Sequence, residues 1–390
     1  MPLNLSRLNN NTRFEKIYFT KRIPQYPFMK ITLIAGARPN FMKIAPIIHA
    51  IEKYSSNKQI TYRLIHTGQH YDEKMSQVFF EDLNIKTPEV NLEVGSGSHA
   101  VQTAQIMVKF EQELLAHPTD VVLVVGDVNS TLACSVVAKK LNTQLVHVEA
   151  GIRSFDLNMP EEINRMVTDA LSDHFFTTSD YANTNLKNAG ITEDRIHFVG
   201  NVMIDTLLKN KHRFVANAKW NELNLQPQSY WLLTLHRPSN VDDADKLKSI
   251  LTLIAEHAGD LPIIFPIHPR TLQIFKQLPE SIVTKFILLD PMRYLEFMYF
   301  VQHAKAVITD SGGIQEETTV LAIPCMTIRE NTERPETVTI GSNVLVEDLT
   351  ALPSHMKQVL DNTWKKSGIP PMWDGNTAER IIEKLMELYA

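Results

Sequence analysis

Two carboxylates stand where apolar segments of the chain give way to polar ones. Asp127 follows an apolar run after a single glycine, and Glu149 closes the next run. If both runs are strands, the two side chains meet at one edge of a sheet. Partial burial and mutual repulsion should then raise the pKa of at least one of them. This arrangement predicts an acid–base site.

Glu161 is the third candidate acid–base group. It follows Pro160, a favoured first residue of a helix. There it could act on a substrate, or it could suit the helix dipole and pair with Arg165 four residues later.

Three basic side chains stand after apolar runs, where they could bind phosphate. Arg38 follows the first run and Lys43 lies one turn later. Together they could neutralise a diphosphate, with Arg as a fork and Lys as a point charge, although a surface salt bridge is the alternative. His236 directly follows another apolar run and is a candidate for catalysis or phosphate contact.

The segment 310–317 combines the end of an apolar run, a glycine pair and a helix start. Ser311, Gly312 and Gly313 would leave backbone amides open to a phosphate, although a Ser cap with a packing glycine pair is the alternative. Glu317 could hydrogen-bond ribose hydroxyls or be a solvated helix carboxylate. Phe297 could face a base. The dinucleotide motif GxGxxG and the motif GxxxxGK[ST] are both absent from the sequence.

The elements that must position these residues are read from apolar runs without alternation, which are typical of parallel strands buried on both faces. Spacers long enough for crossover helices separate the runs, so the pattern is repeated βαβ. We expect two doubly wound parallel sheets joined near 200–201, each with six strands. The predicted strands are 31–35, 62–66, 121–125, 145–149, 174–178 and 196–199, then 231–235, 263–267, 286–289, 306–309, 324–328 and 343–346.

Composition narrows the function classes. The 390 residues are 44% hydrophobic and 21% charged, and 39 Lys and Arg against 44 Asp and Glu give a net charge of −5. Such a chain has no basic surplus for nucleic acid and no apolar run long enough to span a membrane. Cys134 and Cys325 are expected to be free thiols. We expect a cytoplasmic protein of two domains, with residues 1–28 as an extension outside the fold.

Seven motifs in order resemble the non-hydrolysing UDP-N-acetylglucosamine 2-epimerases, from residue 29 to the C-terminus. They are GARP (36–39), TGQH (67–70), GD (126–127), HVEAG (147–151), PEEINR (160–165), DSGGIQEE (310–317) and TERPE (332–336). The resemblance implies two Rossmann-like domains facing a cleft, as in GT-B glycosyltransferases. It divides the chain into an N-terminal domain (29–200), a UDP-binding domain (201–372) and a last helix (373–390) returning to the first domain. It also implies a homodimer, with neither metal nor nicotinamide cofactor.

The resemblance also implies site roles. UDP would be held by Arg38, His236, Phe297, Ser311, Gly312, Gly313, Glu317 and Arg334, and the sugar by Lys43, Asp127, Glu149, Glu161 and Arg165. The implied reaction inverts C2 of UDP-GlcNAc to give UDP-ManNAc, by elimination and re-addition of UDP through 2-acetamidoglucal, for surface polysaccharide synthesis.

The resemblance extends to a possible regulatory site. It also leaves open other functions for the protein. Gln69 and His70 match a second UDP-GlcNAc site, but Asp72 stands where regulated enzymes have a glutamine, so we expect hyperbolic kinetics. The segments 36–39 and 153–155 also resemble relatives acting on 2,3-diacetamido uronic acid nucleotides. Two rivals from different classes are a GT-B glycosyltransferase and a non-catalytic nucleotide-sugar sensor.

Overall fold

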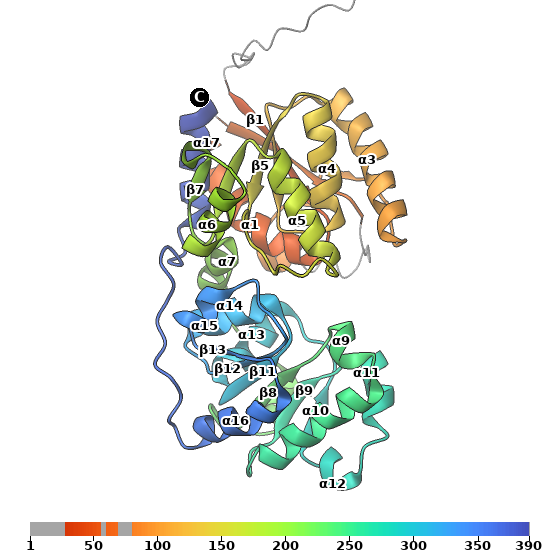
Figure 1. The fold of residues 1–390 in the computed structure, drawn as a ribbon, viewed down its shortest axis with the longest axis vertical. Helices are drawn as coiled ribbons and strands as arrows, with labels where there is room; N and C mark the ends of the chain where they lie inside the picture. Colours follow the sequence, from red (N-terminus) through yellow and green to blue (C-terminus); the bar gives the residue numbers. More distant parts are fainter. Residues whose placement is uncertain (1–27, 56–59, 69–79, 390) are drawn as a thin grey trace, which may run out of the picture.

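The protein folds around two parallel sheets, one above the other in Figure 1. The computed structural model describes residues 28–55, 60–68 and 80–389. The first sheet has the order β3-β2-β1-β4-β5-β6-β7 and the second β10-β9-β8-β11-β12-β13. The strands are β1 Met29–Ala35, β2 Ile60–His66, β3 Val90–Asn91, β4 Val121–Val125, β5 Gln144–Val148, β6 His174–Thr177, β7 Ile196–Phe198, β8 Trp231–Thr234, β9 Ile263–Pro266, β10 Phe286–Leu289, β11 Ala306–Thr309, β12 Cys325–Ile328 and β13 Asn343–Val346.

The predicted fold class is confirmed, with one correction to the strand count. The first sheet has seven strands in place of six, because β3 pairs in parallel with the end of β2. A strand of two residues carries no apolar run, so its sequence gives no signal.

Helices cover both faces of each sheet (Figure 1). Their bounds are α1 Arg38–Tyr54, α3 His99–Ala116, α4 Asn129–Lys140, α5 Pro160–Leu171, α6 Asp180–Asn188, α7 Val202–Asn210, α8 Ala218–Glu222, α9 Pro238–Val241, α10 Ala244–His257, α11 Pro269–Phe275, α12 Glu280–Val283, α13 Tyr294–His303, α14 Gly312–Leu321, α15 Pro335–Thr339, α16 Leu352–Leu360 and α17 Thr377–Tyr389.

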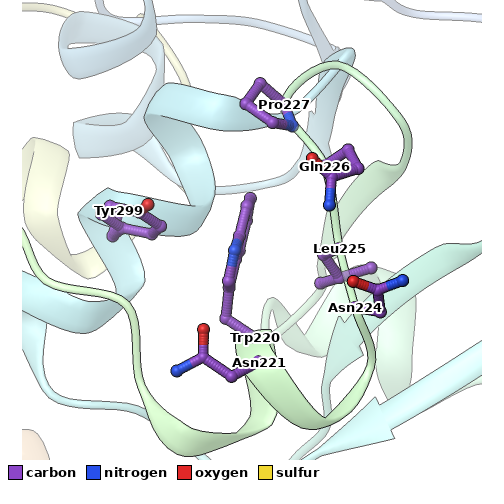
Figure 2. A pocket seen from close by; sticks show the side chains of 7 residues that line it. All are labelled: Trp220, Asn221, Asn224, Leu225, Gln226, Pro227 and Tyr299. Carbon is purple, nitrogen blue, oxygen red and sulfur yellow. The ribbon is translucent and has the colours of Figure 1, made fainter.

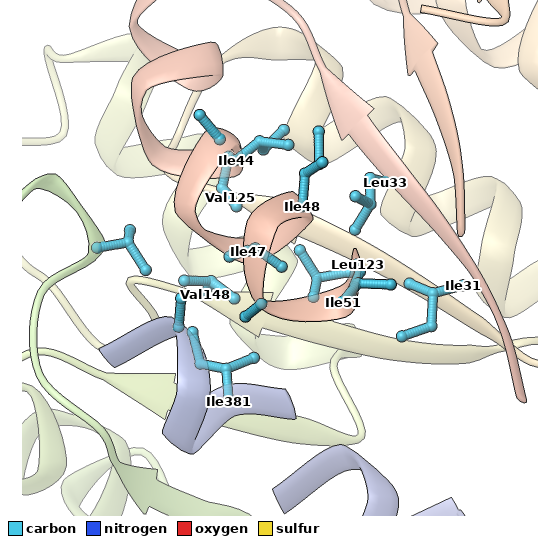
Figure 3. Close-up of a cluster of buried hydrophobic side chains, with 14 of the residues drawn as sticks. Ile31, Leu33, Ile44, Ile47, Ile48, Ile51, Leu123, Val125, Val148 and Ile381 are labelled. Atoms are coloured by element: carbon cyan, nitrogen blue, oxygen red, sulfur yellow. The ribbon is translucent and has the colours of Figure 1, made fainter. Parts of the chain in front are cut away.

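Strand β4 shows why the runs are apolar throughout. Leu123 and Val125 pack with α1 and α17 on one face, whereas Val122 and Val124 pack with α3 and α4 on the other. Figure 3 shows the first of these two cores, with side chains of α1 lying over the strands. In the second sheet, α10 and α16 cover one face and α13 and α14 the other. Because both faces are buried, most strand positions are apolar, and a buried polar exception such as His147 of β5 is hydrogen-bonded.

The chain passes twice between the two halves. Helix α7 follows the first sheet and contributes to cores of both halves. At the other end of the chain, α17 packs against α1 through Ile381, Ile382 and Leu385. Asp205 of α7 accepts hydrogen bonds from the first two amides of α17. The C-terminal helix therefore belongs to the core of the first sheet.

Candidate active site at the carboxyl ends of both sheets

The candidate residues gather where the strand order of each sheet reverses. These points lie between β1 and β4 in the first sheet and between β8 and β11 in the second. Ligands of doubly wound folds bind beyond the carboxyl ends of the strands at such points. Residues from the two halves meet there: Arg165 Nη2 lies 3.6 Å from Glu333 Oε1, and Arg334 Nη2 lies 3.7 Å from Glu149 Oε2.

Asp127 is held by an arginine of α5. Its Oδ2 accepts hydrogen bonds from Arg165 Nε at 3.1 Å and Nη2 at 2.5 Å. Burial alone would raise the pKa of Asp127, but the charges of Arg165 and Lys43 hold it below the usual value. Repulsion between Asp127 and Glu149 was expected to raise the pKa of at least one of them. For Asp127 this expectation is wrong, because cations lie beside its carboxylate.

Glu149 lies between cations from the two halves. Lys43 Nζ contacts its Oε2 at 2.5 Å, and Arg334 approaches the same oxygen from the other half. Its Oε1 is buried and has no hydrogen-bond partner among the described residues. The backbone of Glu149 has φ +67°, a strained conformation for a glutamate, of the kind that gathers at functional sites.

Two roles were expected of Glu161, namely acting on a substrate and pairing with Arg165. The structure gives the pairing with Arg165 to Glu162. Glu162, not Glu161, pairs with Arg165, at 2.9 Å, and it also accepts hydrogen bonds from Ser154. Glu161 is half-buried and has no hydrogen bond or ion pair within the described parts of the chain. The two side chains point in different directions from α5. Glu162 is therefore used to hold Arg165 and Ser154 in place, whereas Glu161 can contact a substrate.

His236 is positioned by Asp310, a residue whose part the sequence did not reveal. The His236 side chain is 61% exposed, and its Nδ1 lies 2.8 Å from Asp310 Oδ1. Asp310 also accepts hydrogen bonds from the backbone amides of His236 and Arg237. Burial would raise the pKa of Asp310, but the contact with His236 keeps it below its usual value. A carboxylate so placed fixes the orientation of the imidazole.

Helix α14 begins with the pair Gly312 and Gly313, and the space beside these two residues is nearly empty. Ser311 is the N-cap, and its side chain makes no capping bond. A Cβ on Gly312 would meet nothing within 4 Å, and one on Gly313 only a methyl of Met203 at 3.9 Å. Amides at the start of this ten-residue helix can therefore approach an anion closely.

Glu317 lies in the middle of α14, and Phe297 lies on the neighbouring helix α13. The Tyr294 hydroxyl donates to Glu317 Oε1 at 2.9 Å. Burial raises the pKa of Glu317 to about 8, although the bond from Tyr294 opposes the rise. Phe297 of α13 is partly buried against the core of the second sheet. Glu317 is thus a buried hydrogen-bonding group and not a solvated helix carboxylate.

Two further glutamates support the arginines of the site, and the sequence did not single them out. Glu316 binds Arg334 Nε, and Arg334 is 8% exposed. Glu333 accepts two hydrogen bonds from Arg329 and faces Arg165. Arg329 lies only four residues before Glu333. The contacts of Glu316 with Arg334 and of Glu333 with Arg165 join separate segments, so residue spacing could not show them.

Some predicted residues lie outside the described structure. Gln69, His70 and Asp72 fall in the undescribed segment 69–79, and the Arg38 side chain is also outside the description. Within the described residues, no group of three metal-ligating side chains could hold a metal ion.

A pocket of about 330 Å³ lies apart from these residues, between α8 and α13. Figure 2 shows its lining, which includes Trp220, Leu225 and Tyr299. Trp220 is only 7% exposed and packs edge-on against four other rings. None of the predicted site residues lines this pocket.

The geometry can therefore bind an anion and move protons in one place. Arg334 and the open start of α14 offer positive charge and amides, whereas Asp127, Glu149 and Glu161 offer proton acceptors. Such a pairing suits a reaction in which a phosphate leaves while a C–H bond is broken.

Comparisons with known proteins agree with this picture. The chain is 42% identical to the UDP-N-acetylglucosamine 2-epimerase of Methanocaldococcus jannaschii, covering 92% of this chain and 99% of that one. The crystal structure of the M. jannaschii enzyme with UDP-GlcNAc and UDP has a TM-score of 0.80 and is covered in full, against 92% of this chain.

Two other proteins bear on substrate and fold. The UDP-2,3-diacetamido-2,3-dideoxy-D-glucuronate 2-epimerase of Pseudomonas aeruginosa is 40% identical, covering 92% of this chain and 100% of that one. The structure of TcCGT1 with UDP has a TM-score of 0.59 at 11% identity, covering 93% of this chain and 100% of that one, and shows the shared fold alone. The family model described as UDP-N-acetylglucosamine 2-epimerase matches residues 52–386. The chain belongs to the UDP-N-acetylglucosamine 2-epimerase family.

Proposed function

We propose that this protein reversibly inverts C2 of UDP-GlcNAc to give UDP-ManNAc. The observation that carries the proposal is the position of Glu149, a buried carboxylate between Lys43 of one half and Arg334 of the other. A proton acceptor there lies beside the cations that a diphosphate needs. The relative from M. jannaschii, named for this activity, supports the choice of reaction.

The chemistry requires the diphosphate to leave. The C2–H bond is weakly acidic because no carbonyl is attached to C2, so direct deprotonation is slow. Loss of UDP with the C2 proton gives 2-acetamidoglucal, and re-addition with protonation on the opposite face gives the epimer. Asp127, Glu149 and Glu161 are the groups we assign to proton transfer at C2.

Groups on the second sheet are assigned to UDP. Arg334, His236 and the amides at Gly312 and Gly313 stabilise the charge that develops on the departing diphosphate. The Ser311 hydroxyl adds a donor at the same helix start. We assign Glu317 to the ribose hydroxyls and Phe297 to the base, and Arg38 and Lys43 to the opposite side of the diphosphate, with Arg165 supporting the sugar end.

The substrate with a carboxylate at C6 is the main alternative, and one contact argues against it. Arg153, in a segment resembling relatives that use such sugars, has its guanidinium 2.6 Å from Asp169 and is 9% exposed. It also donates to the Ile152 carbonyl oxygen. An arginine committed in this way is not free to bind a sugar carboxylate, which favours UDP-GlcNAc.

The test is incubation with UDP-GlcNAc alone, followed by proton NMR of the sugar. We expect the UDP-ManNAc anomeric signal to appear without acceptor or added cofactor. A glycosyltransferase would need an acceptor, and a sensor would bind without turnover. Conversion of only the 2,3-diacetamido uronate, tested in parallel, would move the assignment to that substrate.

We also propose a cytoplasmic homodimer. Helix α3 carries Val101, Val108 and Leu115 at intervals of seven residues, each more than half exposed. An apolar stripe on one helix face suits packing against a second copy. Cys134 and Cys325 are free buried thiols in separate cores, which suits a reducing compartment.

Light scattering tests the dimer. Val108→Glu should give monomers, whereas Val215→Glu, at a similarly exposed valine of the other half, should not. Dimers of unchanged stability in Val108→Glu would exclude this face.

No helix of the described structure is long and apolar enough to cross a membrane.

A further inference from the structure

A buried histidine lies directly behind the candidate carboxylates. His147 precedes the last residue of β5 and is completely buried. Both of its ring nitrogens face oxygen atoms: Nδ1 lies 2.7 Å from Asp169 Oδ1, and Nε2 lies 2.9 Å from the Gly126 carbonyl oxygen. Each contact has the length of a good hydrogen bond.

The two oxygens determine how many protons the ring carries. A neutral imidazole has one N–H donor and one nitrogen lone pair. The Gly126 carbonyl oxygen can only accept, so a bare Nε2 would place two lone pairs together in the interior. A bare Nδ1 would do the same against an ionised Asp169. When Asp169 is ionised, only the ring with both nitrogens protonated satisfies both contacts, and unpaired buried polar atoms are costly.

The carboxyl of Asp169 has donors around both oxygens. Its Oδ2 accepts from Arg153 Nη2 at 2.6 Å and from the Gly151 amide at 3.1 Å. Burial alone would raise the pKa of Asp169, but His147 and Arg153 hold it below its usual value. The two donors to Oδ2, Arg153 and the Gly151 amide, favour an ionised Asp169 independently of the charge of His147.

We propose that His147 is a buried imidazolium which, with Asp169, positions all three catalytic carboxylates. The Gly126 carbonyl that His147 holds belongs to the peptide joined to Asp127. Asp169 holds the amide of Gly151, two residues after Glu149. Asp169 itself lies on α5, the helix that carries Glu161. This positioning role rests on the proposed epimerase function, whereas the protonation state does not.

Neutron diffraction tests the protonation state on the wild-type protein. Crystals of the full chain grown in D2O, at a mildly alkaline pH where an ordinary exposed histidine is neutral, would show the deuterons directly. We expect deuterium on both Nδ1 and Nε2 of His147. A single deuteron on the ring would overturn the proposal, and this result needs no variant.

Kinetics of Asp169→Asn test the positioning role. The amide keeps the shape but removes the charge that holds the imidazolium. We expect kcat to fall on the order of 10–100-fold, the usual scale for outer residues that orient reacting groups. KM for UDP-GlcNAc should change far less, because the UDP groups are assigned mainly to the other half.

Asp173→Asn is the matched control. Asp173 lies just beyond the same helix, pairs with Lys139 at 2.8 Å and accepts from the Leu145 amide of the same strand. Its kcat should stay at the wild-type value. Equal losses in both variants, or a loss confined to KM, would overturn the positioning role. Absence of epimerase activity in the wild type would instead refute the proposed function, while the neutron result would still decide the charge of His147.

Discussion

At the scale of single residues, acid–base chemistry is assigned to three carboxylates in different surroundings. Asp127 is ion-paired with Arg165, and Glu149 lies against Lys43. Glu161 makes no hydrogen bond or ion pair among the described residues, although its charge acts on Arg237. Asp127→Asn, Glu149→Gln and Glu161→Gln keep the shapes but remove proton acceptance. We expect each to lower kcat on the order of 10²–10⁴-fold.

The affinity for UDP, measured by calorimetry, should change less in these variants, because Arg334 and the start of α14 remain. Glu193→Gln, at an exposed carboxylate paired with Lys187, serves as the control. Turnover near that of the wild type in all three variants would show that other groups transfer the proton.

Glu336 gives a second prediction at this scale, for stability against pH. It is 2% exposed, and neither carboxyl oxygen has a hydrogen-bond partner among the described residues. Burial raises its pKa from 4.5 to about 7. The folded protein therefore favours the neutral acid, whose stabilising contribution is present at low pH and is lost as the pH rises through about 7.

Glu336→Gln should therefore be more stable than the wild type at mildly alkaline pH, on the order of 1–3 kcal/mol. Calorimetric unfolding at several pH values measures this, with the exposed Glu347→Gln as the control. If wild type and Glu336→Gln kept the same pH profile, Glu336 would not be the titrating group.

At the scale of elements, most strands could be predicted from the sequence, but several contacts between side chains of different elements could not. Apolar runs such as 121–125 and 306–309 match β4 and β11 residue for residue, because burial on both faces leaves few polar positions; Thr309 at the end of β11 is one of them. The two residues of β3 leave no such pattern. Asp310 opens one of the seven motifs, yet its bond to His236 joins residues 74 positions apart. Spacing predicts neighbours on one element, whereas tertiary contacts depend on how elements meet.

Helix α17 carries the prediction for this scale. Leu385 is completely buried in the core of the first sheet, although it lies at the far end of the chain. Leu385→Ala should cost about 2–5 kcal/mol of stability. Glu387→Ala, on the exposed side of the same helix, should cost little. Equal unfolding midpoints for the two variants would mean that α17 contributes little to this core.

At the scale of the whole molecule, the proposed site draws residues from both halves. The two chain crossings lie side by side, since Gly200 approaches the Met372 carbonyl so closely that a Cβ would lie 2.1 Å from that oxygen. We propose the boundaries near 200 and 372 as the hinge between the domains. Arg165–Glu333 and Arg334–Glu149 are contacts that closure would tighten.

UDP should therefore favour a closed arrangement by contacting both domains. Solution scattering should show that UDP compacts the wild type, and that it compacts Arg334→Ala less. Arg334→Ala should also bind UDP more weakly. An unchanged scattering profile for the wild type at saturating UDP would contradict closure, although it would leave the site assignment intact.

The central claim is that C2 loses and regains a proton while UDP is detached. Its most direct test is the reaction of UDP-GlcNAc in D2O, followed by NMR and mass spectrometry of the product. The account predicts UDP-ManNAc with deuterium at C2 from the first turnovers, and deuterium at C2 of recovered UDP-GlcNAc as the reaction reverses. UDP-ManNAc that keeps the original hydrogen at C2 throughout turnover would contradict it.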